Sequence, residues 1–180
     1  MNAPNKIAAI GIVTVSDRAS SGTYRDSSGP AIEEFLRTAL TTPWRAVRRL
    51  VPDGIESVRN ALIDLADREN CALVFTTGGT GPAPRDMTPE GTIAACIKLM
   101  PGFGQLMRSE SLKKVPTAIL SRQTAGIRGS TLIVNLPGRP ESIRVNMQAV
   151  FPAIPYCLDL IGAARIEADP RLCNTFRPSK

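Results

Sequence analysis

The residues best suited to chemistry lie in one stretch, Thr76 to Glu90. There a glycine-rich bend, Gly78-Gly79-Thr80-Gly81, follows a short apolar run, and Thr88-Pro89-Glu90 is typical of a helix start. Glycines allow backbone amides to converge on phosphate oxygens, because no Cβ blocks the approach. Asp86 adds a carboxylate beside the bend, which phosphoryl chemistry could use to hold a metal ion or position a nucleophile.

A purely structural interpretation fits the same stretch. Two glycines after a strand often make a tight turn, and Thr-Pro-Glu starts many ordinary helices. The stretch has neither the Gly-Lys-Ser/Thr ending of a Walker A motif nor a Gly-x-Gly-x-x-Gly fingerprint. On the loop alone, a turn and a phosphate cradle are equally compatible with the sequence, so the rest of the chain has to decide.

The composition narrows the available chemistry. The 180 residues include no histidine, which excludes a Ser-His-Asp triad, a Cys-His pair and a His-ligated metal site within this chain. Catalysis would have to use carboxylates, Lys and Arg, hydroxyls, backbone amides or a bound metal ion, and these are the groups that handle phosphates. Four widely spaced cysteines without a Cys-x-x-Cys pair predict buried free thiols rather than a zinc site.

The charge and hydropathy of the chain bear on its partners. The net charge of +6 comes mostly from arginine, whose guanidinium pairs well with phosphate and carboxylate. The basic residues are scattered without interleaved aromatics, so we expect an anionic small molecule and no nucleic acid. No apolar run reaches the roughly 18 residues of a membrane span, and the start of the chain lacks the apolar core of a signal peptide. We therefore expect a cytoplasmic protein with no membrane partner.

Predicted strands and helices alternate along the chain. Strands are expected at Ile7–Val15, Trp44–Val51, Ala72–Phe75, Ala118–Leu120 and Thr131–Asn135. Helices are expected at Pro30–Leu40, Ile55–Arg68, Thr88–Leu99, from a break at Pro101–Gly104 to near Lys114, and from Glu141 to Ile161 with interruptions at Pro152 and Pro155. This alternation predicts an α/β fold with a mostly parallel sheet covered on both faces. We expect one domain over residues 6–162 and a C-terminal tail without periodicity over residues 163–180.

Ligands of such a fold bind in the crevice beyond the carboxyl ends of the strands. Each polar loop of this chain could be a simple connection, since loops favour these residue types. Five of them at one predicted edge nevertheless favour a shared site. They are Ser16-Asp17-Arg18, Pro52-Asp53-Gly54, Thr77 to Asp86, Ser121-Arg122 and Leu136-Pro137-Gly138.

The acidic candidates in these loops are Asp53 and Asp86. Two carboxylates near a phosphate cradle could bind Mg²⁺, which prefers oxygen ligands and often bridges to substrate phosphates, or could steer a proton from an attacking oxygen. Simpler roles stay open for each. Asp53 could be a turn residue, Asp86 could pair with Arg85 or cap the nearby helix, and Asp17 could also be a turn residue.

The order of these motifs matches a known family. The chain resembles the Mog-type molybdopterin adenylyltransferases of molybdenum cofactor biosynthesis over about Lys6 to Ile161. The matching stretches are Val15–Gly22, Leu50–Asp53, Thr76–Glu90 with its Gly-Gly-Thr-Gly and Arg-Asp-x-Thr-Pro-Glu, Pro101–Gly104, Pro116–Gln123, Asn135–Gly138 and Ile154–Cys157.

The resemblance implies a three-layer α/β/α domain, a molybdopterin-binding domain, that forms a homotrimer. It also implies Mg²⁺-dependent transfer of AMP from ATP to the terminal phosphate of molybdopterin, with release of pyrophosphate. The adenylylated product then passes to the protein that inserts molybdate, a molybdopterin molybdenumtransferase.

The same resemblance implies roles for individual residues. Asp53 and Asp86 match the two aspartates on which the family's activity depends. The residues expected in the binding crevice are Ser16, Asp17, Gly78, Gly79, Thr80, Gly81, Ser121, Pro137 and Gly138. The metal ligands are not assigned. The alternatives are a paralogue that binds molybdopterin without adenylylating it, a binding or scaffolding module and, least favoured, a nucleic-acid binder.

Overall fold

The computed structural model describes residues 7–179, which form one six-stranded sheet with helices on both faces. The strands are β1 (Ala8–Val15), β2 (Trp44–Val51), β3 (Leu73–Thr77), β4 (Lys98–Leu99), β5 (Ala125–Arg128) and β6 (Thr131–Leu136). The α-helices are α1 (Asp17–Ser20), α2 (Ser28–Ala39), α3 (Ile55–Ile63), α4 (Thr88–Ala95), α5 (Pro101–Leu112), α6 (Pro140–Val150) and α7 (Ile154–Leu160). A π-helical turn, η1 (Asp64–Arg68), extends α3, and two 3-10 helices, η2 (Pro116–Leu120) and η3 (Phe151–Ala153), precede β5 and α7.

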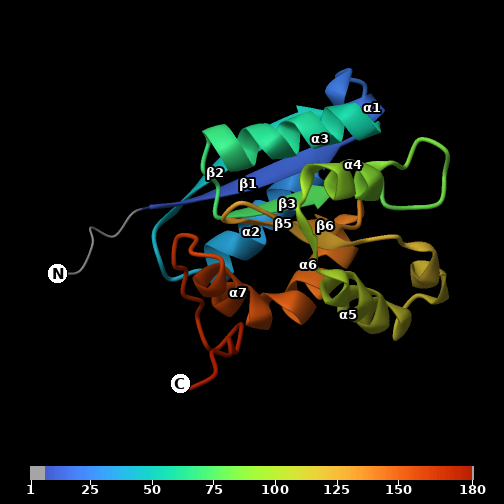
Figure 1. The fold of residues 1–180 in the computed structure, drawn as a ribbon. Helices are drawn as coiled ribbons and strands as arrows, with labels where there is room; N and C mark the ends of the chain where they lie inside the picture. The colour runs from blue at the N-terminus through green and yellow to red at the C-terminus, as the bar shows by residue number, and fades with distance from the viewer. Residues whose placement is uncertain (1–6, 180) are drawn as a thin grey trace.

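The sheet is mostly parallel, as the sequence predicts. Its order is β2-β1-β3-β6-β5-β4. The first four strands in this order run parallel, and β5 and β4 are antiparallel to their neighbours. Helices α3 and α4 lie over one face, and α2, α5, α6 and α7 lie over the other (Figure 1). This arrangement confirms the predicted three-layer α/β fold.

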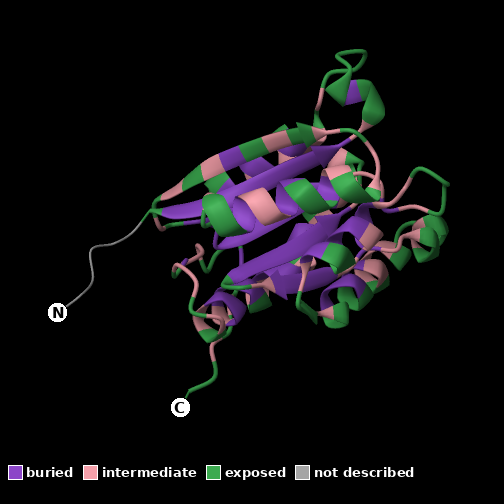
Figure 2. Cartoon of the chain, turned by 45° about the horizontal axis from the view of Figure 1, so that its top comes forward, coloured by how far each residue is buried: buried purple, intermediate pink, exposed green. Residues whose placement is uncertain are grey.

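Strands buried on both faces explain why the central runs are apolar throughout. All eight residues of β1 are buried (Figure 2). Ile10 and Ile12 pack with the core under α2 and α6, whereas Val13 and Val15 pack with the core under α3. Successive side chains of a strand point to opposite faces, so a central strand between two helical layers needs apolar residues at every position.

Four predicted details of the edge half of the sheet are wrong. Residues Ala118–Leu120 form the end of 3-10 helix η2 rather than a strand, because Pro116 occupies the first position of η2 and no strand of residues 7–179 pairs with this run. The helix that begins at Thr88 ends at Ala95, and Lys98–Leu99 forms β4 instead. Pro101 begins α5, which runs through Gly104, so this segment starts a helix instead of breaking one. Strand β5 was not predicted, since Gly126 and Arg128 weaken its apolar pattern.

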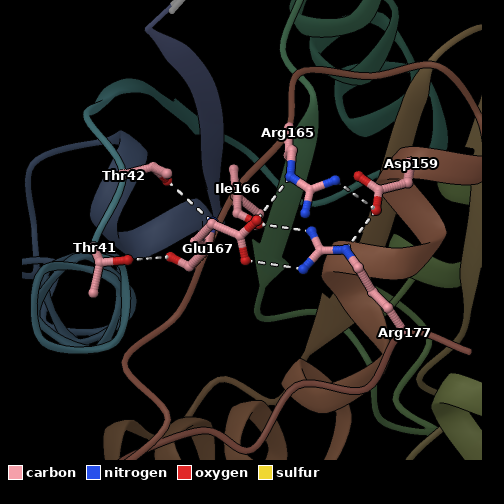
Figure 3. A network of polar contacts seen from close by, with 7 residues as sticks. All are labelled: Thr41, Thr42, Asp159, Arg165, Ile166, Glu167 and Arg177. Atoms are coloured by element: carbon pink, nitrogen blue, oxygen red, sulfur yellow. Dashed lines mark hydrogen bonds and ion pairs between the residues drawn. The ribbon is translucent and has the colours of Figure 1, made fainter. Parts of the chain in front are cut away.

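The segment after residue 162 packs against the domain within the described residues. Ile166 and Cys173 are buried in the core under α2, and Ala168 forms a bridge with Leu40. The Arg177 guanidinium contacts the carboxylates of Asp159 at 2.5 Å and Glu167 at 2.9 Å, as Figure 3 shows. Whether residues 163–180 act as a separate tail stays a prediction.

Two further expectations concern whole classes of structure. In the described part of the chain, no helix combines the length and the apolar character needed to cross a membrane. Cys71, Cys157 and Cys173 are buried and Cys96 is partly buried, and all four are free thiols, as expected. Burial raises the pKa of the Cys71 and Cys96 thiols to about 11, so neither is a reactive thiolate at neutral pH.

Candidate active site

The polar loops meet at the carboxyl end of the parallel strands. The loops after β1, β2, β3 and β6 all start at this end of the sheet, near α1 and the loop that precedes α4 (Figure 1). Ser121-Arg122 reaches the same end by another route. Because β5 is antiparallel to β6, the segment that enters β5 lies where β6 ends, and Ala125 pairs with Val134. The expected convergence of five loops is therefore present.

Asp17 and Asp53 are joined across two loops by reciprocal hydrogen bonds. The backbone amide of Asp17 donates to Oδ2 of Asp53 at 3.0 Å, and the amide of Asp53 donates to Oδ1 of Asp17 at 3.0 Å. Ser16 caps α1, since its Oγ accepts from the amide of Ala19 at 3.2 Å. These contacts bring the carboxylates of Asp17 and Asp53 together. They also hold Asp53 in place more firmly than an isolated turn residue would be held.

The glycine bend after β3 requires glycine at two positions. Gly78 has a φ of +95°, and a Cβ at this position would lie 2.3 Å from the carbonyl oxygen of Val15. Gly79 has a φ of +61°, and its Cβ would lie 2.4 Å from Oγ1 of Thr88 and 3.3 Å from Oδ1 of Asp53. Any side chain would therefore push the bend away from the end of β1 and from Asp53.

The loop after β6 packs directly against this bend. Oγ1 of Thr77 donates to the carbonyl of Pro137 at 2.8 Å, and Oγ of Ser28 donates to the carbonyl of Gly138 at 2.7 Å. A Cβ on Gly138 would lie 3.4 Å from Cα of Gly78. Pro137 and Gly138 thus lie beside the glycine bend.

A cavity of about 270 Å³ opens between these loops and the segment around Tyr24. Its lining includes Ser16, Arg18, Tyr24, Gly78, Gly138 and Arg139. The Arg18 guanidinium lies over the Tyr24 ring, 5.5 Å from its centroid, which holds an arginine at the cavity wall. Arg18 and Arg139 in this lining suit an anionic ligand.

Asp26 is a lining residue that the sequence analysis did not single out. Its Oδ2 accepts from Oγ1 of Thr14 at 2.7 Å, and its Oδ1 accepts from the amides of Ser28 and Gly29 at 2.9 and 3.1 Å. Asp26 therefore orders the start of α2 beside the cavity. An aspartate two residues before a Ser-Gly-Pro helix start is the sequence signal that could have identified it.

Asp86 lies at the far side of the bend and does not cap α4. Its Oδ2 accepts from the amide of Ala83 at 3.2 Å, and its own amide donates to the carbonyl of Ala83 at 2.9 Å. The N-cap of α4 is Met87, without a side-chain cap. Oδ2 of Asp86 also lies against Gly81, where a Cβ would be 2.7 Å away. Asp53 and Asp86 thus flank the bend next to Gly79 and Gly81, outside the lining of the 270 Å³ cavity.

Thr80 and Ser121 are engaged within the protein. The carbonyl of Thr80, whose side chain is buried, accepts from the amide of Arg122 at 2.8 Å. Oγ of Ser121 donates to Oε1 of Gln123 at 2.7 Å, and Nε2 of Gln123 donates to Oδ1 of Asn146 at 3.0 Å. The predicted site residue Ser121 therefore lies at the carboxyl end of the parallel strands but not in the cavity lining.

A buried polar group beneath the bend was also missed. Nδ2 of Asn135 donates to Oγ1 of Thr76 at 2.9 Å and to Oγ1 of Thr92 at 2.8 Å. These bonds tie β6, β3 and α4 together under the glycine bend. In the described residues, Oδ1 of Asn135 and Oγ1 of Thr88 are buried without a partner. An asparagine in an otherwise apolar strand was the available signal.

Comparison with known proteins agrees with this architecture. A family model described as "Probable molybdopterin binding domain" matches residues 11–156. The molybdopterin adenylyltransferase of Helicobacter pylori strain 26695 is 53% identical over 171 residues, covering 95% of this chain and 97% of that protein. The molybdopterin adenylyltransferase of Escherichia coli K12 is 48% identical over 181 residues, covering 94% of this chain and 93% of that protein.

A solved structure shows the same fold. The molybdopterin biosynthesis enzyme MoaB from Thermus thermophilus superposes with a TM-score of 0.79 at 43% identity, covering 86% of this chain and 96% of that one. The sequence match, the shared fold and the convergence of the motif loops agree. The chain belongs to the molybdopterin-binding-domain family of molybdenum cofactor biosynthesis.

Proposed function

We propose that this chain is a molybdopterin adenylyltransferase, which transfers AMP from ATP to the terminal phosphate of molybdopterin and releases pyrophosphate. The relatives that carry this activity in their names are 53% and 48% identical to it over nearly their whole lengths. The observation that carries the proposal in this structure is the glycine bend, which Asp53 and Asp86 flank at the meeting point of the loops.

The reaction needs no histidine. A molybdopterin phosphate oxygen, already ionised near neutral pH, attacks the α-phosphorus of ATP; the new P–O bond forms as the bond between the α-phosphorus and the bridging oxygen to the β-phosphate breaks, and pyrophosphate leaves with that electron pair. The protein has to align two polyanions and offset their repulsion. We assign that stabilisation to the backbone amides of the bend and to Arg18 and Arg139, both of which line the cavity.

The donor set suits Mg²⁺ bound together with substrate. In the part of the chain that the structure describes, no group of three or more metal-ligating side chains occurs. Mg²⁺ typically uses one or two carboxylates, with water and substrate phosphates completing its shell. Asp17 and Asp53, which their reciprocal hydrogen bonds hold together, would supply those carboxylates. When bound, the ion would neutralise phosphate charge. Because a carboxylate repels a phosphate, Asp53 and Asp86 would act on the reacting phosphates through such an ion, beside the bend that they flank.

The assembly that we propose is a homotrimer. A group of exposed apolar side chains lies around the edge strand β4, at Ile93, Ile97, Leu99 and Leu106, with exposed fractions from 42% to 72%. An adjoining hollow of about 270 Å³ is lined by α5 and by Val150 and Ala153. Exposed apolar side chains gathered near a sheet edge are typical of a subunit interface. Sedimentation equilibrium should give three times the 19.3 kDa chain mass, and a stable monomer would contradict the trimer.

The remaining assignments follow from this function. We propose that residues 6–162 form the molybdopterin-binding domain, that residues 163–180 form a tail and that the product passes to the molybdate-inserting protein. The free thiols of all four cysteines fit a reducing compartment, the cytoplasm.

The test is pyrophosphate release by the purified protein with molybdopterin, ATP and Mg²⁺. Asp86→Asn should lower turnover by about 10²–10³-fold while molybdopterin binding persists, because the substitution keeps the turn to Ala83 and removes the charge. Asp53→Asn should also lower turnover, and full activity in that variant would remove Asp53 from the catalytic residues. Binding of molybdopterin by the unaltered protein without any adenylylated product would favour the paralogue that only binds.

A further inference from the structure

Arg122 joins three points around the loop that carries Asp86. Its Nε donates to the carbonyl of Gly81 at 2.9 Å, where the loop begins, and one terminal nitrogen donates to the carbonyl of Asp86, where the loop ends. The other terminal nitrogen donates to the carboxylate of Glu90 in the first turn of α4. The Pro82–Arg85 segment between these contacts is exposed.

The backbone of Arg122 strengthens the same connection. Its amide donates to the carbonyl of Thr80 at 2.8 Å, so the segment that enters β5 is fixed to the glycine bend before the side chain contributes. The side chains of Arg122 and Glu90 are 38% and 33% exposed. Burial by itself would raise the pKa of Glu90, but the hydrogen bond from Arg122 keeps that pKa below its ordinary value. Glu90 is therefore an ionised partner at neutral pH.

We propose that Arg122 is a positioning residue for AMP transfer, which holds the two ends of the Asp86 loop at a fixed separation and so sets where the Asp86 carboxylate lies. The inference rests on the proposed function and on the role of Asp86 in it. A planar guanidinium with five donors can contact Gly81, Asp86 and Glu90 together. The single ammonium nitrogen of lysine cannot span these acceptors in the same geometry.

Arg128 provides a matched control. It contacts both carboxylate oxygens of Asp67, at 2.9 and 2.6 Å, and the carbonyl of Ala95 at 3.0 Å. It thus ties down the C-terminal end of α4 through a comparable set of bonds, at the opposite end of β5 from Arg122. Arg128→Lys changes the same number of donors and no charge, and it leaves the Asp86 loop untouched.

The experiment compares kcat, KM and unfolding temperature for Arg122→Lys and Arg128→Lys. We expect Arg122→Lys to lower kcat by about 10–100-fold, as for a displacement of about 1 Å at a reacting group, with KM for ATP and molybdopterin changed less than about threefold. Arg128→Lys should leave kcat unchanged while its unfolding temperature falls by a similar amount. Added guanidinium should restore part of kcat in Arg122→Ala, because it can re-form the bridge.

Two outcomes would overturn the inference. One is equal kcat in the two lysine variants, and the other is a loss in Arg122→Lys that affects KM alone. In either case pyrophosphate release by the unaltered protein would leave the proposed function intact. Absence of that release in the unaltered protein would instead count against the proposed function itself.

Discussion

Replacing Gly78 by alanine tests whether the bend is held against the end of β1 in the way that the structure shows. The new Cβ meets two penalties. The φ of +95° is unfavourable for an L-residue, and the Cβ would lie 2.3 Å from the carbonyl oxygen of Val15, a backbone atom that no side-chain rotation can move aside.

The two penalties can be separated with a control glycine. Gly129 has a φ of +54° in the turn between β5 and β6, and a Cβ there would have no neighbour within 4 Å. Gly129→Ala should therefore cost only the backbone term, about 1–2 kcal/mol of unfolding free energy. Gly78→Ala should cost at least this backbone term, because its φ of +95° lies farther from the left-handed minimum, and should add an overpacking term of about 1–3 kcal/mol, for a total of at least about 2 kcal/mol.

Urea unfolding of both variants measures these costs, and pyrophosphate release measures the effect on the site. Because total stabilities lie near 5–15 kcal/mol, Gly78→Ala should stay largely folded at room temperature yet lose activity, since Val15 and Gly78 both line the cavity. Equal destabilisation by the two substitutions, or a folded and fully active Gly78→Ala protein, would refute this account of the bend.

Two further perturbations address the support beneath the bend. Asn135→Leu removes the bonds to Thr76 and Thr92 and leaves buried hydroxyls unpaired, so urea unfolding should show a loss of about 1–3 kcal/mol, and unchanged stability would contradict it. The pKa of Glu90 is lowered from 4.5 in the folded protein. Its pair with Arg122 therefore stabilises the fold above about pH 4.5, and this stabilisation disappears as the pH falls through the lowered pKa. The free energy of unfolding of Glu90→Gln should therefore be lower than that of the unaltered protein near neutral pH, and the two values should converge in acid. A difference that stays constant across this pH range would contradict the pairing.

The sequence predicts the central half of the fold better than its edge. Strands β1, β3 and β6 are buried on both faces, so their apolar runs are unambiguous. Strands β4 and β5 have two and four residues and include Lys98, Gly126 and Arg128, so their pairing depends on neighbours that local patterns do not reveal. The apolar Ala118–Leu120 run is part of a 3-10 helix, and among the described residues no strand pairs with it.

For the candidate site, motif order indicated which loops converge but not how their residues bond. Asp53 and Gly79 come together as expected. The reciprocal bonds of Asp17 with Asp53 and the bridge that Arg122 makes to the Asp86 loop join residues 36 positions apart. Contacts of that separation depend on the sheet topology, which becomes known only after the strands have been paired. Asn135 and Asp26 were missed because a single polar residue has no periodicity to mark it.

The most direct measurement of the central claim follows the α-phosphate of ATP. The protein is incubated with molybdopterin, Mg²⁺ and ATP labelled at the α-phosphorus, and the pterin product and pyrophosphate are quantified together. We predict that the label enters the pterin product with one pyrophosphate released for each molecule formed, and that Asp86→Asn abolishes most of both. Molybdopterin that binds but remains unlabelled, with no pyrophosphate released, would contradict the assignment as an adenylyltransferase.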